Sequence, residues 1–231
     1  MEPPKELPFN LQTEFLKEHK EVQLQNGETV IFESFKVDSM HLFHGSRVHG
    51  IQELTEADET TIGNGVYLTS NKEAAYGYGV VRSSKQDDQP TLYVVELTDL
   101  NILNLSTWDG IKSFAKKFKE VLSQRKDQIK VDHNKIMDKN TAEFIKYSTV
   151  KNIEERIGMI DYDSYRSLKD LLFGLGDWAR SMLQDMGYDG LMAIEGGEVG
   201  NGVDIGKHDS YVIFDPKQVK VVEQQQFASI I

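Results

Sequence analysis

The sequence predicts an α+β domain with a largely antiparallel sheet, and the distribution of its strand-like and helix-like segments supports this fold class. Strand-like segments lie within the first 105 residues, helical periodicity dominates residues 110–186, and strand-like segments return over residues 191–222. Strands at both ends with helices between them are typical of α+β domains. With 231 residues, 27% of them charged and 39% hydrophobic, the chain fits one globular domain spanning residues 1–231.

Residues 1–39 are expected to form a short helix followed by a β-hairpin. Residues 11–20 carry apolar side chains at helical spacing. Asn26-Gly27 then separates two apolar segments. Because both positions of a two-residue hairpin turn favour a positive φ, this pair is a strong signal for such a turn.

Alternating apolar residues and flanking turn residues predict a series of short strands further along the chain, with one capped helix among them. Either Ser70 or Asn71 can cap the helix, which runs through Tyr76. The strands are expected at Met40–Phe43, Val66–Leu68, Leu92–Leu97, Ile102–Leu105, Leu191–Ile194, Tyr211–Phe214 and Val219–Val222.

Residues 110–186 are predicted to form a helical insertion between the strands. Gly187 fits the position just after its last helix, where a positive φ is common. Apolar residues recur in the insertion at helical spacing, at Ile111, Phe114, Ala115, Phe118 and Leu122, and again at Leu168, Leu171 and Leu172.

The composition limits the chemistry that this chain can perform. Because it has no cysteine, disulfides, thiolate zinc sites and cysteine nucleophiles are excluded. No apolar run approaches the ~20 residues that a membrane-spanning helix needs, and the first residues lack the pattern of a secretory signal. By default we expect a cytoplasmic protein without a membrane partner, and a secreted effector or toxin stays open as an alternative.

The charge is negative overall and unevenly distributed. A formal net charge of −11 argues against a surface that follows a nucleic-acid backbone throughout. Between Lys112 and Lys130, however, seven Lys or Arg residues stand against two acidic ones, a net of +5. This segment is either a solvated helix face or a docking patch for an acidic partner such as a nucleic acid.

Three separated segments carry residues suited to binding a ligand that has hydroxyl groups and a flat ring. His44-Gly45-Ser46 combines hydrogen-bonding side chains with a glycine that lets a ligand approach the backbone. Tyr67 and Tyr78 offer aromatic faces that can enclose a cationic ring such as nicotinamide. Residues 208–216 follow a glycine-rich loop suited to a mobile flap. Each segment taken singly also has an ordinary explanation as a surface histidine, packing tyrosines or a turn.

Together these segments resemble the ADP-ribosyltransferase superfamily, on the branch that contains the poly(ADP-ribose) polymerases and diphtheria-type toxins. His44-Gly45-Ser46 matches the strand that holds the NAD ribose in that branch. Gly63-x-Gly65-Val66-Tyr67-Leu68 matches the strand with the first stacking tyrosine, and Tyr78 follows eleven residues later as the second. The segment 210–216 matches the frame of the final strand. The resemblance covers roughly residues 40–100 and 187–222.

This resemblance implies a split antiparallel β-sheet core with the helical stretch as an insertion. It also implies that NAD is the substrate, that no metal is needed, and that ADP-ribose is transferred with release of nicotinamide. The NAD contacts that it implies come from His44, Gly45, Ser46, Gly65, Tyr67 and Tyr78.

Two departures from the family pattern bear on the mechanism. The catalytic glutamate of the family corresponds to Ser210 here, and a serine that contacts nicotinamide corresponds to Ala75. Breaking the ribose–nicotinamide bond builds positive charge on the ribose, which a nearby carboxylate stabilises. Glu195 and Glu198, at the start of the glycine loop, are the first candidates for this carboxylate, because a loop that folds back over the ligand delivers either one to the site. Asp209 ranks third, because side chains alternate along a strand and its own should point away from Ser210.

The function that these residues predict is mono-ADP-ribosylation of a macromolecular acceptor, either a protein or a nucleic acid. The candidate catalytic residues are His44, Tyr67, Ser210, Glu195, Glu198 and Asp209. Serine at the glutamate position also fits an inactive interaction module that binds NAD or ADP-ribose. A third interpretation takes Glu154, Glu155, Asp161 and Asp163 as magnesium ligands of another enzyme class such as a nuclease, although acidic pairs of this kind usually just face water.

Overall fold

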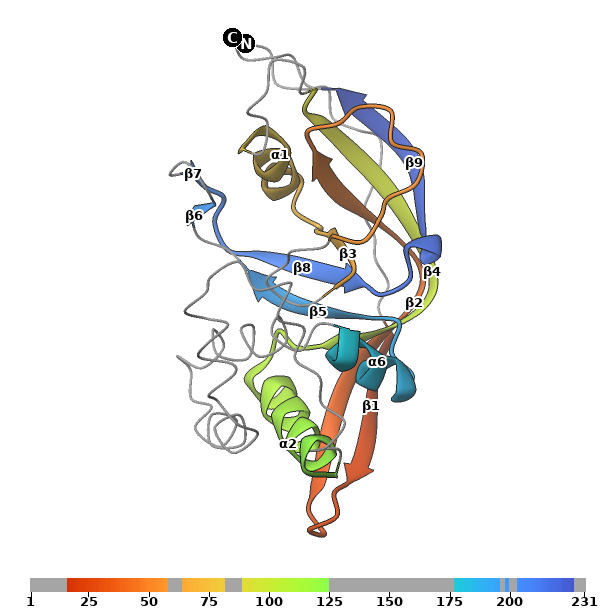
Figure 1. The fold of residues 1–231 in the computed structure, drawn as a ribbon, viewed down its shortest axis with the longest axis vertical. Coiled ribbons are helices and arrows are strands. Elements are labelled where there is room, and N and C mark those ends of the chain that lie inside the picture. Colours follow the sequence, from red (N-terminus) through yellow and green to blue (C-terminus); the bar gives the residue numbers. More distant parts are fainter. Residues whose placement is uncertain are drawn as a thin grey trace.

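A computed structural model of the chain describes residues 16–57, 64–81, 89–124, 177–195, 198–199 and 203–226. These residues form a mixed α+β fold in which one seven-stranded sheet is the core and three α-helices pack against it (Figure 1). The predicted fold class is therefore confirmed at the level of a mixed α+β fold with a mostly β core.

The seven strands have the order β1-β2-β4-β5-β8-β3, and β9 pairs with β4 beside this path. Two short strands, β6 (Glu198–Val199) and β7 (Val203–Asp204), pair only with each other. The strands of the main sheet are β1 (Leu16–Gln23), β2 (Thr29–Ser46), β3 (Val66–Leu68), β4 (Thr91–Asn104), β5 (Gly190–Glu195), β8 (His208–Ile213) and β9 (Val219–Gln226).

Strand β4 changes its neighbour along its length, so the sheet branches there. Residues 91–97 pair with β9, whereas residues 102–104 pair in parallel with β5. Asp99 lies between the two halves with a φ of 55°, a conformation that interrupts a regular strand. The other pairings in the described sheet are antiparallel. The two separate strands predicted at 92–97 and 102–105 are thus parts of one long strand.

Of the two elements predicted at the N-terminus, the helix is wrong and the hairpin is confirmed. Where the structure describes it, the helix expected over residues 11–20 is instead strand β1, paired with β2 from Leu16↔Lys36 to Gln23↔Thr29. Nearly all of β1 is exposed, with Leu16 65% exposed, so the strand lacks the in-out alternation that identifies most strands.

The predicted hairpin is present, but its turn has a different form. Gly27 N–H donates to the Leu24 carbonyl (3.0 Å) and Leu24 N–H donates to Glu28 (2.7 Å), which closes a three-residue loop. Gly27 has a φ of 84°, whereas Asn26 is not among the residues with positive φ. This is the arrangement of a type I turn followed by a glycine bulge, in which only the glycine needs the left-handed conformation.

The three helices begin and end on local signals. Helix α1 (Lys72–Val81) is capped by Asn71, whose Oδ1 accepts from Ala74 N–H at 2.9 Å. It extends one turn beyond the predicted end at Tyr76. Helix α2 (Trp108–Gln124) and helix α6 (Asp177–Asp185) are the described parts of the predicted insertion. After α6, Gly187 has a φ of 88° and donates to Gln184, as expected for a glycine that ends a helix.

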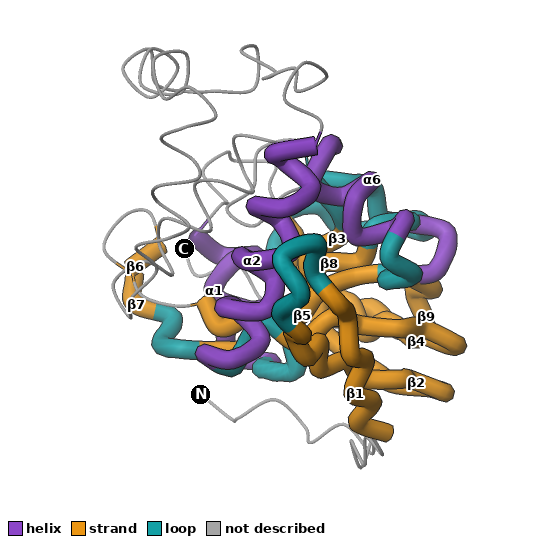
Figure 2. Tube along the Cα trace, turned by 90° about the horizontal axis from the view of Figure 1, so that it is seen from below, coloured by secondary structure: helices purple, strands orange, loops and turns teal. Residues whose placement is uncertain are grey.

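The helices lie on one side of strands β1, β2 and β4 in the view of Figure 2. One core cluster joins the predicted apolar face of α2 to the sheet, and includes Phe32, Phe114, Phe118, Leu191 and Val212. A second cluster contains Leu42, Tyr93, Ile102, Tyr211 and Ile213. A smaller one, formed by Phe43, Ala75, Leu92 and Val94, holds α1 against the ends of β2 and β4.

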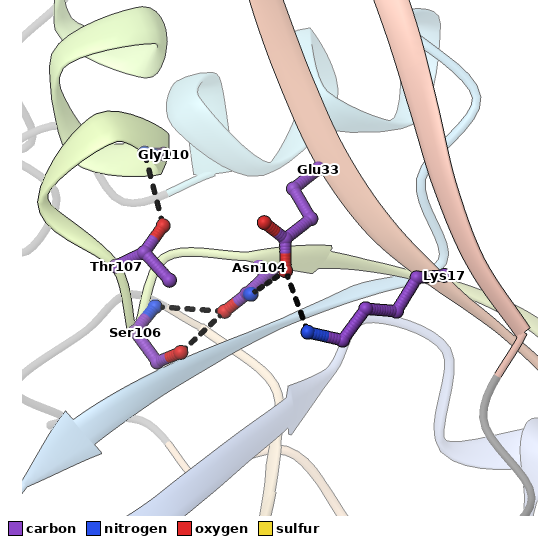
Figure 3. A network of polar contacts seen from close by, with 6 residues as sticks. All are labelled: Lys17, Glu33, Asn104, Ser106, Thr107 and Gly110. Atoms are coloured by element: carbon purple, nitrogen blue, oxygen red, sulfur yellow. Dashed lines mark hydrogen bonds and ion pairs between the residues drawn. The ribbon is translucent and has the colours of Figure 1, made fainter.

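Buried polar contacts fix the connection from β4 to α2 (Figure 3). Asn104 is 2% exposed, and its Oδ1 accepts from both the backbone and the hydroxyl of Ser106 (2.9 and 2.6 Å). Its Nδ2 donates to Glu33 of β2 at 2.6 Å. Thr107 then caps α2 by accepting from Gly110 N–H at 3.1 Å. Among the described helices, none is long and apolar enough to cross a membrane.

Candidate functional site

His44 and Tyr67 meet where the end of β2 approaches β3. The His44 Nδ1 lies 2.9 Å from the carbonyl oxygen of Tyr67. A carbonyl oxygen only accepts hydrogen bonds, so Nδ1 carries the hydrogen and the Nε2 of the neutral ring is left as an acceptor. Phe43 and Thr69 exchange two backbone hydrogen bonds beside this contact (2.8 and 2.9 Å). Two predicted site residues that are 23 positions apart in the sequence are thus in direct contact.

The two glycines predicted to contact NAD have a structural reason to be glycine. A Cβ at Gly45 would overlap the carbonyl oxygen of Ala75 in α1. A Cβ at Gly65 would lie 2.6 Å from a methyl group of Val212 and 2.7 Å from the carbonyl oxygen of Ile213. We expected Gly45 to let a ligand approach the backbone, and the structure shows in addition that the protein itself fills the space of the missing Cβ at both glycines.

Asp209 lies on the opposite face of β8 from Ser210, as side-chain alternation predicts. Its Oδ1 accepts from the Thr69 hydroxyl (3.1 Å) and from Ser70 N–H (3.2 Å), which anchors the turn that leads into α1. The Tyr211 hydroxyl also donates to Asp209, and burial together with this carboxylate raises the pKa of the Tyr211 phenol. In the structure Asp209 therefore stabilises the turn before α1 and is not brought to Ser210.

Ser210 and Glu195 form a close polar pair in the candidate site. The Ser210 hydroxyl donates to the Glu195 carboxylate at 2.6 Å. The pair is buried, with 3% of Ser210 and 7% of Glu195 exposed. Glu195 ends β5 and pairs with His208, while Ser210 pairs with Ala193, so both side chains share one face of the sheet. A hydrogen bond to a carboxylate in such surroundings is stronger than a bond between neutral groups.

Tyr78 reaches the same face of β8 from helix α1. Its hydroxyl lies 3.5 Å from the Nε2 of His208, and the two rings meet edge to face, with centroids 5.7 Å apart at 74°. We did not select His208 from the sequence as a site residue. The signal was available, because His208 and Ser210 are two positions apart on a strand and must share a face.

Tyr67 completes this face from the other neighbour of β8. It pairs with Val212 and packs against the core cluster that contains Val212. Along β8, Ser210 lies midway between His208, which contacts Tyr78, and Val212, which pairs with Tyr67. The fold therefore gathers Tyr67, Ser210, Glu195 and Tyr78 from four different elements onto one face.

Other predicted residues have less definite positions. Ser46 ends β2, and its hydroxyl oxygen accepts from Val48 N–H at 3.2 Å. Glu198 begins the short strand β6, and its side chain is outside what the structure describes. Also outside the described residues are Gly63, Gly196, Gly197, Leu168, Leu171, Leu172 and the acidic residues Glu154, Glu155, Asp161 and Asp163. Within the described ranges, no group of three or more His, Asp or Glu side chains could hold a metal ion.

The described part of the basic segment is matched by acidic partners. Lys116 pairs with Glu28 in the β1–β2 turn, and Lys117 pairs with Glu120 on the same helix. The hydrogen bond from Lys116 is the main cause that lowers the pKa of Glu28. Residues 125–130 lie outside the described ranges. On the described part of α2, the lysines therefore carry less unbalanced charge than the sequence count indicated.

Comparisons with known proteins add little to the description of this site. No family model matches the sequence, and none of the curated proteins matches it. Among solved structures, the chain is similar to one in the crystal structure of the M. tuberculosis MbcT-MbcA toxin-antitoxin complex, with 11% identity and a TM-score of 0.38. That alignment covers 82% of this chain and 84% of the other. A TM-score at this level establishes neither a shared fold nor a shared activity.

Proposed function

We propose that this chain is a member of the ADP-ribosyltransferase superfamily that transfers single ADP-ribose units from NAD to a macromolecular acceptor. The observation that carries the proposal is the buried hydrogen bond from Ser210 to Glu195. This bond brings a carboxylate next to Ser210, the residue that corresponds to the family's glutamate. Further support comes from Tyr67, which lies on the same face of the sheet, and from Tyr78 of helix α1, which contacts His208 on that face.

The proposed binding mode assigns each aromatic and polar residue a part of NAD. Tyr67 and Tyr78 enclose the nicotinamide ring, whose positive charge is attracted to their faces. His44 holds the nicotinamide-side ribose. Because its Nδ1 is committed to the Tyr67 carbonyl, its Nε2 is the ring atom that accepts from a ribose hydroxyl.

In the proposed reaction the bond between the ribose C1′ and the nicotinamide nitrogen breaks, and nicotinamide leaves with the bonding electron pair. The ribose ring becomes a cationic, oxocarbenium-like species. A nucleophilic atom of the acceptor then bonds to C1′ and releases its proton to the solvent. Ser210 accepts from the ribose 2′-hydroxyl while it donates to Glu195, so that the carboxylate stabilises the cation through the serine.

This arrangement favours single additions over polymer. To extend a chain, an enzyme must activate a hydroxyl of the previous ADP-ribose unit, and in the family the glutamate that is Ser210 here performs that step. Glu195 lies behind the serine in this proposal, so it is poorly placed to take a proton from an incoming ribose. We therefore expect transfer to stop after one unit.

A second candidate function is an interaction module that binds NAD or ADP-ribose without chemistry. The specific feature that favours it is again Ser210, because a serine brings no charge of its own to the ribose. Under this alternative, the Glu195 contact has only a structural role.

The two candidates are separated by measuring binding and nicotinamide release on the same preparation. Equilibrium dialysis with NAD labelled in the adenine ring measures binding, and chromatography measures nicotinamide in the presence of lysate protein and RNA. The transferase binds NAD and releases nicotinamide. If the chain binds NAD but releases no nicotinamide with any acceptor, the interaction module is the better account.

A further inference from the structure

His208 is a buried titratable residue that the proposed chemistry does not use. It begins β8, is 5% exposed, and shares a face with Ser210 and with its pairing partner Glu195. A polar ring in such a position needs hydrogen-bond partners. The structure provides one on each side of the ring.

The first partner fixes which nitrogen carries the hydrogen. The His208 Nδ1 lies 3.0 Å from the carbonyl oxygen of Gly206, which only accepts. In the neutral ring, Nε2 is then an acceptor directed at the Tyr78 hydroxyl, 3.5 Å away. This distance is at the long limit of a hydrogen bond, but the edge-to-face ring contact at 5.7 Å joins the same two side chains independently.

Tyr78 has particular need of such a contact because of its place in helix α1. It lies between Gly77 and Gly79, and glycine lowers the stability of a helix at both neighbouring positions. Both glycines are closely packed, since a Cβ at Gly77 would lie 2.5 Å from a methyl group of Ile205 and one at Gly79 would lie 3.2 Å from the carbonyl oxygen of Ser46. Contacts from outside the helix, such as those of His208, therefore help to fix the Tyr78 ring.

We propose that His208 is a positioning residue for Tyr78, holding its ring in the orientation that stacks on nicotinamide. This inference rests on the proposed function and adds to it a residue of β8 that affects the affinity for NAD. That residue, His208, is itself held by the Gly206 carbonyl. His208 does not touch the substrate in this account. Its effect is exerted on NAD affinity, through Tyr78.

Two near-isosteric substitutions separate the two hydrogen bonds of the ring. His208→Asn keeps a donor near the Nδ1 position, for Gly206, and removes the group that faces Tyr78. His208→Gln places an amide near the Nε2 position, where it can still accept from Tyr78. We expect His208→Asn to weaken NAD binding about fivefold and His208→Gln less than twofold, measured by equilibrium dialysis.

A double-mutant cycle with Tyr78→Phe then tests whether the effect passes through Tyr78. The affinity of the double variant Tyr78→Phe/His208→Asn for NAD should be no lower than that of whichever single variant has the lower affinity. The same cycle in urea unfolding without NAD should also be non-additive, which checks the contact independently of any ligand.

The outcomes distinguish this inference from the function on which it rests. Additive effects on NAD binding, or equal losses in the Asn and Gln variants, would overturn the positioning role while leaving NAD binding intact. If the unaltered chain binds no NAD, the proposed function fails and the positioning role fails with it, even where the unfolding cycle is non-additive.

Discussion

Removing the charge of Glu195 without removing its hydrogen bond is the sharpest perturbation of the proposed mechanism. Glu195→Gln keeps an oxygen that can accept from the Ser210 hydroxyl, so the local packing of β5 on β8 is preserved. The variant loses only the negative charge. NAD binding should therefore change little, while the rate of transfer should fall.

The size of the effect follows from the distance between the carboxylate and the ribose. The Ser210–Glu195 hydrogen bond is 2.6 Å long. A second hydrogen bond from the serine to the ribose places the carboxylate about 7 Å from the developing charge. At an effective dielectric constant of about 20, two unit charges at this distance interact by about 2.4 kcal/mol. Such a loss slows the reaction roughly 60-fold.

The assay compares single-turnover rates of nicotinamide release at saturating NAD. Ser210→Ala should slow the reaction to a similar extent, and the double variant should be little slower than either single one, because both changes break the same relay. Glu96→Gln is a matched control, since it removes a carboxylate whose partner is the surface residue Lys220. A Glu195→Gln enzyme that works within threefold of the wild-type rate would refute the relay.

Four further variants test binding, packing and titration. Tyr67→Ala should weaken NAD binding about 2- to 12-fold in equilibrium dialysis, and unchanged affinity would remove Tyr67 from the site. Gly45→Ala should lower the free energy of unfolding by about 3 kcal/mol in urea, because its methyl group would overlap the Ala75 carbonyl oxygen. Gly187 has open space around it but a φ of 88°, so Gly187→Ala should lower the free energy of unfolding by only about 1 kcal/mol. Within the described residues the buried Tyr188 hydroxyl has no hydrogen-bond partner, so Tyr188→Phe should leave stability at pH 8 unchanged or raise it by about 1 kcal/mol. Burial raises the pKa of Tyr188 to about 12. The stability that its neutral phenol contributes is therefore complete below pH ~10 and is lost as the pH rises toward 12. At pH 11, the Tyr188→Phe variant should unfold less readily than the wild type.

Elements that depend on a few neighbouring residues could be predicted from the sequence. The hairpin at Asn26-Gly27, the helix cap at Asn71 and the helix end at Gly187 all follow from local backbone preferences. The apolar face of α2 was predicted for the same reason, since Phe114 and Phe118 are one turn apart and both are buried.

Features that depend on pairing between distant segments could not be predicted in this way. Strand β1 is exposed on both faces, so no alternation marks it, and only its pairing with β2 makes it a strand. The contact between Ser210 and Glu195 depends on the register of β8 against β5. Glu195 was a candidate from the sequence, but we expected it to reach the site by folding back with the glycine loop. The structure instead places it at the end of β5, directly beside the serine.

The central claim is that this chain transfers one ADP-ribose unit at a time from NAD. Its most direct test is mass spectrometry of lysate protein and RNA after incubation with the chain and isotopically labelled NAD. We predict acceptors that gain the mass of a single labelled ADP-ribosyl group, with no longer products at any time point. Polymers of ADP-ribose on any acceptor would contradict the role given to Ser210, and acceptors without label under conditions where NAD binds would contradict the transferase itself.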